Sequence, residues 1–159
     1  MEADEKYMKL ALEEAERSIA DGEVPVGAVV VYQGRVIAKA HNTRENDNDI
    51  SGHAEINAIR LAEKALGRWT LEGCSLYVTL EPCLMCAGAI RQSRLTTLVY
   101  GAGDAEEGAV KSAFHVFDGD NGSQNIVSGV LENDCSDILK RFFSSRRATQ
   151  KERAKNGSK

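Results

Sequence analysis

The chain has 159 residues, of which 42% are hydrophobic and 28% charged, with four cysteines and two prolines. This length is typical of one domain with its own hydrophobic core, and the composition excludes a disordered or collagen-like protein. No apolar run approaches the roughly 18 residues of a membrane span, and the acidic N-terminus does not resemble a secretory signal. We therefore expect a cytoplasmic protein whose cysteines are thiols or metal ligands.

The net charge of −4 is distributed unevenly. Between Lys140 and Lys159 eight basic residues accompany one acid, so this end carries a charge of +7 and the rest of the chain −11. An acidic surface argues against broad contact with nucleic acid, whereas the basic end can bind a phosphate backbone locally. The same end is equally consistent with a solvated C-terminal tail.

The hydrophobic pattern predicts helices that alternate with strands. Apolar residues spaced near 3.6 predict an amphipathic first helix, the Gln33-Gly34 turn between two apolar runs predicts a hairpin, and Gly67 is placed to end a helix. We expect helices at 4–20, 54–66, 83–91 and from 133 through 143, a helical turn or two at 109–117, a surface turn at 118–123, and strands at 24–32, 35–41, 75–80, 95–100 and 126–130.

This order of elements predicts a single α/β domain with three layers, α/β/α, around a mixed five-stranded sheet. We place the domain at residues 1–147 and expect residues 148–159 to form a flexible basic tail. Two polar motifs fall where a predicted helix begins after a strand or loop. Such motifs meet at the carboxyl edge of a sheet, where α/β domains usually bind their ligands.

These motifs are His53-Ala54-Glu55 and Pro82-Cys83-Leu84-Met85-Cys86. The Cys-x-x-Cys spacing places two sulfurs on one helical turn, so both reach one tetrahedral zinc ion. A helix N-terminus lowers the pKa of a thiol and favours the thiolates that the metal requires. With His53 the set has three protein ligands, which is typical of a catalytic zinc ion that keeps one position for water.

Glu55 is two residues from the predicted ligand His53. A carboxylate close to the metal but not on it can move protons from an attacking water to a ring nitrogen and to a departing amine. Taken alone, Glu55 reads equally well as an exposed helix acid, and the cysteine pair as a redox dithiol or a structural zinc site. The two motifs together, in this order and separated by a helix and a strand, favour the catalytic interpretation.

The order His-x-Glu and then Pro-Cys-x-x-Cys is the signature of zinc-dependent nucleobase deaminases. The chain resembles the cytidine deaminase superfamily, and within it the bacterial tRNA adenosine deaminases, which convert the wobble adenosine of an anticodon to inosine. The zinc motif marks the superfamily, and the other segments indicate the tRNA branch. The resemblance extends from the first helix to about Arg147 and is carried by residues 22–31, 40–42, 53–55, 77–90, 99–102, 142–143 and 146–147.

The resemblance implies a cytidine-deaminase-like fold, one zinc ion per subunit, a homodimer, and tRNA as a partner. His53, Cys83 and Cys86 match the zinc ligands of the family, and Glu55 matches its proton shuttle. The positions that match the family's substrate contacts are Asn42 and Ala54 at the flipped nucleotide, Asp104 beside the target base, and Phe142, Phe143, Arg146 and Arg147 on the helix that meets the anticodon stem-loop.

The chain departs from the usual family pattern at residues 49–52 and between residues 109 and 127. Both departures lie on the expected substrate side. A free nucleobase, nucleoside or nucleotide, such as guanine, cytosine or deoxycytidylate, therefore stays open as the alternative substrate. A non-catalytic zinc module, with Cys74 as a fourth ligand, is a third hypothesis. Otherwise we expect Cys74 and Cys135 to be core residues, at least one of the two phenylalanines to be buried, and His41 and His115 to be structural.

Overall fold

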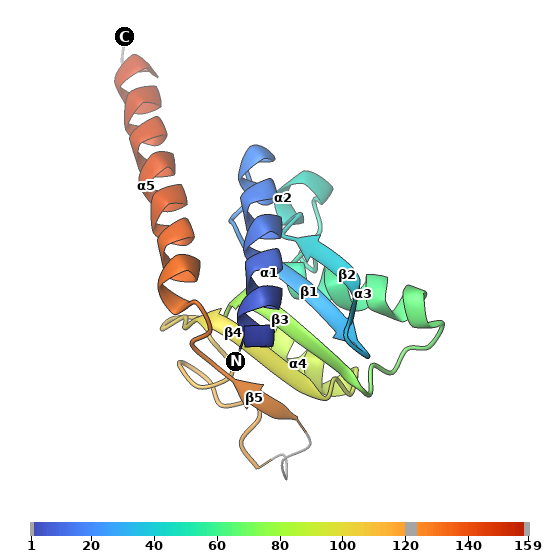
Figure 1. Ribbon diagram of the computed structural model, residues 1–159. Helices are drawn as coiled ribbons and strands as arrows, with labels where there is room; N and C mark the ends of the chain where they lie inside the picture. The colour runs from blue at the N-terminus through green and yellow to red at the C-terminus, as the bar shows by residue number, and fades with distance from the viewer. Residues whose placement is uncertain (1, 120–123, 158–159) are drawn as a thin grey trace.

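The computed structural model describes residues 2–119 and 124–157, which form a five-stranded sheet with helices on both faces (Figure 1). The strands are β1 (Gly27–Tyr32), β2 (Arg35–His41), β3 (Cys74–Leu80), β4 (Thr97–Ala102) and β5 (Asn125–Val127). The helices are α1 (Glu2–Ala20), α2 (Arg44–Asp47), α3 (Ala54–Leu66), α4 (Leu84–Gln92) and α5 (Glu132–Gly157). The expected three-layer α/β/α architecture with a mixed sheet is confirmed.

The strand directions fix where the ends of the strands meet. The order across the sheet is β2-β1-β3-β4-β5, with β1 antiparallel to both of its neighbours and β3, β4 and β5 parallel. Strands β2, β3, β4 and β5 therefore point the same way. Their carboxyl ends, together with the start of β1, form a single edge of the sheet. This is the edge at which the sequence predicts the zinc site.

One face of the sheet is covered by α1 and by the first turns of α5. Alternate residues of neighbouring strands, among them Val29, Tyr77 and Val99, pack against Met8 of α1 and Cys135 of α5. Side chains of a strand alternate between its two faces, so the residues between these positions point to the opposite face. In Figure 1 α5 then extends away from the sheet, and only its first turns contribute buried residues.

The other face is covered by α3 and α4. Val30, Leu76 and Leu98 of the sheet pack against Ala58 of α3 and Ile90 of α4. Helix α3 occupies the residues that the sequence pattern predicts, and it ends at Gly67, which has the left-handed conformation that glycine adopts without strain. The two helices that carry the zinc motifs are thus fixed to the same face of the sheet.

Several predicted elements differ from the structure. The strand expected at 24–32 begins at Gly27, a short helix α2 lies in the predicted loop, and the segment 109–117 forms turns rather than helix. The segment expected to be a flexible tail from residue 148 is a continuation of α5 as far as Gly157. The surface turn expected at 118–123 lies partly outside the described residues. Among those residues, no helix is both long and apolar enough to cross a membrane.

Candidate zinc and catalytic site

The carboxyl edge of the sheet brings together residues from three parts of the chain. Asn42 follows β2, Cys83 follows β3, and Asp104 follows β4. They line one pocket of about 280 Å³ together with His53 and Glu55. This volume is close to the lower limit of small-molecule sites, roughly 300 Å³, and suits a single nucleobase. Three further polar residues line the same pocket and were not indicated by the motifs: Arg44, Glu81 and Glu107.

The predicted metal ligands converge beside this pocket, which His53 and Cys83 line. The Nδ1 atom of His53 lies 3.6 Å from Sγ of Cys83 and 3.5 Å from Sγ of Cys86. A tetrahedral zinc ion with ordinary Zn–N and Zn–S bonds separates such atoms by about 3.6 Å. The donor atoms present therefore fit zinc without rearrangement. Within the described part of the chain these three residues are the one group of at least three histidine, cysteine or acidic side chains close enough to hold a metal ion.

The local backbone explains why both motifs point into the pocket. His53 and Cys83 are the residues immediately before α3 and α4, and both have extended backbone conformations. Two helices therefore direct their N-terminal ends, where the helix dipole is positive, toward the same point. Cys86, one turn into α4, is fully buried. This arrangement favours negatively charged sulfur ligands.

The titration properties of the two thiols follow from their contact with each other. The hydrogen bond from Cys86, and then the one from His53, lower the pKa of Cys83 to about 3. The same contact with Cys83, together with burial, raises the pKa of Cys86. The hydrogen bond with Cys83 is also the main cause that raises the pKa of His53. One thiolate is thus already favoured by the protein, and a dication supplies the charge that favours the second.

Glu55 lies in the first turn of α3 and is almost fully buried, with 4% of its surface exposed. Burial raises the pKa of its carboxyl group to about 7. It lines the pocket beside His53 and Cys83 but is not part of the ligand group. A buried carboxyl group that faces the pocket and is close to the metal ligands has the placement that proton transfer to a bound base requires.

Glu81, just before the second motif, lines the pocket and holds the segment that follows β4. Its carboxylate accepts hydrogen bonds from the backbone N–H groups of Asp104, Val110, Lys111 and Ser112, at 2.8–3.1 Å, and from the Ser112 hydroxyl. Although burial acts in the opposite direction, these bonds lower the pKa of Glu81 to about 2. They also explain why the segment 109–117 is not helical, since its N–H groups bind this carboxylate instead of helix carbonyls.

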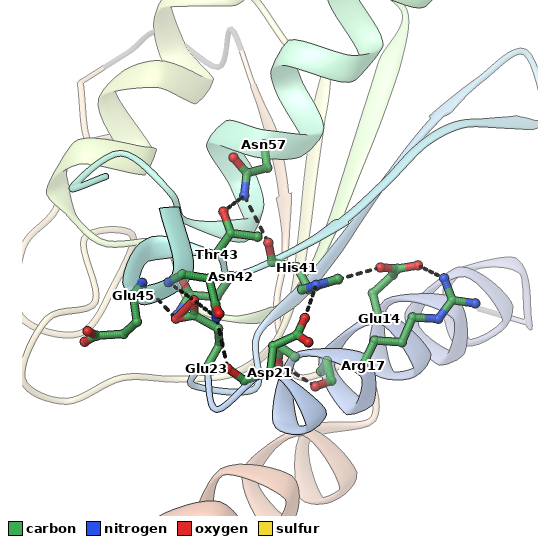
Figure 2. Close-up of polar contacts among 12 residues, drawn as sticks. Glu14, Arg17, Asp21, Glu23, His41, Asn42, Thr43, Glu45 and Asn57 are labelled. Carbon is green, nitrogen blue, oxygen red and sulfur yellow. Dashed lines mark hydrogen bonds and ion pairs between the residues drawn. The ribbon is translucent and has the colours of Figure 1, made fainter. Parts of the chain in front are cut away.

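Glu23 holds the loop after β2, as Figure 2 shows. The buried Glu23 accepts hydrogen bonds from the N–H groups of Glu45 and Asn46 at the start of α2, at 3.0 and 2.9 Å. These contacts, with those to the Asn46 side chain and the charge of Arg44, lower the pKa of Glu23 despite its burial. Asn42, in this same loop, is 7% exposed and lines the pocket.

Ala54 and Asp104 also line the pocket. The carboxylate of Asp104 accepts hydrogen bonds from the N–H groups of Glu106 and Glu107, each at 3.1 Å. Asp104 therefore shapes its own loop.

The four expected substrate residues on α5 lie outside the pocket. Phe142 and Arg146 line a hollow against the end of α1, and the Arg146 guanidinium lies 5.9 Å from the centre of the Phe142 ring. Phe143 and Arg147 line a second hollow against Ala102 and Gly103, the residues just before Asp104. Phe142 is partly buried and Phe143 is 39% exposed, so the expectation that one of them is a core residue is wrong.

The remaining cysteines are core residues, as expected, and the remaining histidines lie close to carboxylates. Cys74 and Cys135 are fully buried, and neither belongs to the ligand group, which removes the support for Cys74 as a fourth ligand. His115 pairs with Asp118 on the surface. His41 lies 3.0 Å from the buried carboxylate of Glu14 on α1 (Figure 2).

Comparisons with known proteins agree with this site. The family model for the cytidine and deoxycytidylate deaminase zinc-binding region matches residues 1–102. The tRNA-specific adenosine deaminase of Bacillus subtilis is 46% identical over 158 residues, which cover 98% of each chain. A solved structure from work on A-to-I editing by tRNA:A34 deaminases at the wobble position matches with a TM-score of 0.81 and 46% identity, covering 84% of this chain and 99% of the other.

A guanine deaminase structure, also from Bacillus subtilis, is 40% identical with a TM-score of 0.60, but it covers 62% of this chain and 64% of its own. A structure from work on guanine deaminase from Nitrosomonas europaea covers more of this chain, 87%, with a TM-score of 0.77, but it is 25% identical. The fold is therefore shared with enzymes that act on small molecules, whereas identity of 46% over 98% of the chain is found with a tRNA-specific adenosine deaminase. The chain belongs to the cytidine and deoxycytidylate deaminase family of zinc enzymes, in the branch of the tRNA-specific adenosine deaminases.

Proposed function

We propose that this protein hydrolyses the wobble adenosine of a tRNA anticodon to inosine and ammonia. The observation that carries the proposal is the pocket, where a buried carboxyl group lies beside a three-ligand zinc site with room for one base. The full-length similarity to tRNA-specific adenosine deaminases supports this substrate over a free base.

The residues of the pocket have separate roles in this reaction. His53, Cys83 and Cys86 hold the zinc ion, which supplies the Lewis acidity that makes water nucleophilic near neutral pH. Glu55 removes a proton from the water that attacks C6 and delivers it to N1 of the purine. It then moves a second proton to the departing amino group. Adenosine and water thus become inosine and ammonia, and Glu55 returns to its starting state.

The remaining contacts serve to hold the nucleotide. We assign the Asn42 amide and the backbone at Ala54 to the flipped base and its sugar, and Asp104 to the neighbouring nucleotide. An adenosine in an anticodon loop reaches such a pocket by leaving the base stack, as in other enzymes that act on bases.

The stem of the RNA is assigned to α5. The hollow of Phe143 and Arg147 borders Gly103, next to Asp104, and the hollow of Phe142 and Arg146 borders Gly22, two residues from the pocket residue Val24. Arginine and aromatic side chains bind phosphates and unstacked bases together. We therefore place the anticodon stem-loop along α5, with its target base in the pocket.

We also propose a cytoplasmic homodimer. Three large apolar side chains are well exposed on the loop before α3, on α3 and on α4: Ile50 at 81%, Leu61 at 44% and Leu84 at 50%. Exposed apolar side chains of this size are common at interfaces between subunits. Analytical ultracentrifugation tests the dimer: a species of about 35 kDa supports it, and a 17.3 kDa species at micromolar concentration contradicts it.

The substrate is tested by ammonia release from an anticodon stem-loop with a wobble adenosine, compared with adenosine, guanine, cytosine and deoxycytidylate. We expect ammonia from the stem-loop alone. Release from guanine or cytosine, with the stem-loop unchanged, would assign the enzyme to the small-molecule branch. Glu55→Ala serves as the control for contaminating deaminases.

A further inference from the structure

Asn57 lies on α3, two residues after Glu55, and is half-buried. Its side-chain Nδ2 donates one hydrogen bond to the main-chain carbonyl of His41, at 3.0 Å, and another to the hydroxyl of Thr43, at 2.9 Å (Figure 2). These two acceptors belong to the residues on either side of Asn42. A single amide group therefore bridges the backbone that carries the substrate residue.

The same residue is tied to the metal site. The backbone N–H of Asn57 donates to the carbonyl of His53, at 3.0 Å, which is the first helical hydrogen bond of α3. Asn57 thus lies one turn from a zinc ligand, on the helix that also carries Glu55. Its side chain connects this helix to the loop that follows β2, in addition to the hydrogen bond from the Thr43 N–H to the Gly52 carbonyl, at 2.8 Å, just before the helix.

The orientation of Thr43 supports a specific role for this contact. Thr43 is the N-cap residue of α2, a position where a threonine hydroxyl ordinarily binds a free N–H of the helix. Here it makes no side-chain cap hydrogen bond. The N–H groups of Glu45 and Asn46 bind Glu23 instead, which leaves the Thr43 hydroxyl to accept from Asn57.

Among the described residues, the side chain of Asn42 makes only weak hydrogen bonds. Its Nδ2 is 3.5 Å from the Val24 carbonyl, and its Oδ1 is 3.4 Å from the N–H of Arg44, both near the limit for a hydrogen bond. The direction of the Asn42 amide therefore depends on the backbone at residues 41–43. The shorter contacts that Asn57 makes fix that backbone on both sides of it.

We propose that Asn57 is a positioning residue: it sets the Asn42 amide at the correct distance and angle from the zinc site and Glu55. This role rests on the proposed function, in which Asn42 binds the flipped nucleotide. Asn57 has no contact with substrate in this account and acts only through Asn42. Loss of its two hydrogen bonds lets the loop after β2 shift relative to α3. A small displacement of a group that positions the substrate lowers the rate of the catalysed reaction by about 10- to 100-fold.

The test is a double-mutant cycle of Asn57→Leu and Asn42→Ala, measured as kcat/KM on the stem-loop with zinc content determined for each protein. Asn57→Leu has similar size and no donor. We expect a 10- to 100-fold loss in the wild-type background, less than a twofold further loss in the Asn42→Ala background, and one zinc per chain throughout. Equal losses in both backgrounds, or loss of zinc with Asn57→Leu, would overturn the proposal.

Thr43 provides a matched pair that avoids any change in α3. Thr43→Val removes the hydroxyl at nearly constant volume and should lower kcat/KM several-fold, whereas Thr43→Ser keeps the acceptor and should restore it. Equal activity of these two variants would also contradict the proposal. A wild-type protein inactive on the stem-loop overturns the proposed function instead, and the cycle is then measured on the substrate that the protein does deaminate.

Discussion

The Nδ1 atom of His53 lies 3.5 Å from the Sγ atom of Cys86, although 33 residues separate them in the chain. The contact exists because α3 and α4 pack on the same face of the sheet and begin at the same edge of it. A metal ion bound there therefore joins two helices and two loops. Zinc should stabilise the fold as well as supply the chemistry.

Removal of zinc should lower the thermal stability of the protein and abolish its activity. A ligand that binds only the folded state stabilises it by about 2.7 kcal/mol at 100 times its Kd, so the melting temperature of chelator-treated protein should fall by several degrees and recover when zinc is added. Differential scanning calorimetry with metal analysis measures both effects. Cys86→Ser should lose the zinc, whereas Cys74→Ser should keep one ion per chain. Zinc loss from both variants would contradict the three-ligand site.

Glu81→Gln should loosen the loop from Asp104 to Ser112. The carboxylate accepts hydrogen bonds from four backbone N–H groups. The NH₂ group of a glutamine is itself a donor, so it cannot accept any of these bonds. We expect a loss of about 1–3 kcal/mol in the free energy of unfolding, with faster amide hydrogen exchange at residues 104 and 110–112. Glu106→Gln on the exposed part of the same loop is the control. Equal stability of the two variants would show that the contacts of Glu81 contribute little.

The sequence was sufficient for elements that depend on local pattern and insufficient for those fixed by distant contacts. The periodicity of residues 54–66 and Gly67 predicted α3 correctly, and the two motifs predicted the ligand group. The turns at 109–117 could not be predicted, because Glu81, almost 30 residues earlier, determines them. The position of Glu81 directly before Pro82-Cys83 indicated that it lies near the site. It did not indicate that its carboxylate binds the N–H groups of residues 110–112.

The roles of Glu23 and Asn57 were likewise missed. Each acts on a loop more than 10 residues away, Glu23 at the N–H groups of α2 and Asn57 at residues 41 and 43. An acid in a loop and an amide on a helix are ordinary surface residues by sequence. The extension of α5 to Gly157 was missed for a related reason, since its last turns have no apolar stripe that would indicate a packed helix.

Gly27 tests the packing of α1 on the sheet. A Cβ atom at this position would lie 1.9 Å from the Ala11 carbonyl oxygen and 2.6 Å from the Ala15 nitrogen. Gly27→Ala should therefore destabilise the protein by at least about 1–3 kcal/mol. This is the typical cost of adding a methyl group to a core that has no space for it. Gly88, in α4, has open space, so Gly88→Ala should be neutral or stabilising by about 0.5–1 kcal/mol. Urea unfolding of both variants measures the difference, and equal midpoints would contradict the close packing.

Arg147→Glu should weaken the reaction on RNA without affecting the zinc site. If Arg147 contacts a phosphate, its loss should raise KM for the stem-loop and reduce the dependence of log(kcat/KM) on log salt by about 0.7–0.9. Arg35→Glu makes the same change in net charge at the opposite end of β2, away from the pocket, and should leave the slope unchanged. Identical slopes for the two variants would remove α5 from the RNA-binding surface.

In the proposed function, Glu55 and the three-ligand zinc site deaminate one adenosine, at the wobble position. The most direct test is sequencing of a stem-loop that carries several adenosines, after reaction with zinc-loaded wild-type protein and with zinc-loaded Glu55→Gln. Glu72→Gln, at an exposed acid remote from the pocket, is the control. We expect inosine at the wobble position only, formed by the wild type and by Glu72→Gln and reduced at least 1,000-fold, about 4 kcal/mol in activation free energy, by Glu55→Gln. Undiminished inosine with Glu55→Gln, or inosine spread over all the adenosines, would contradict the account.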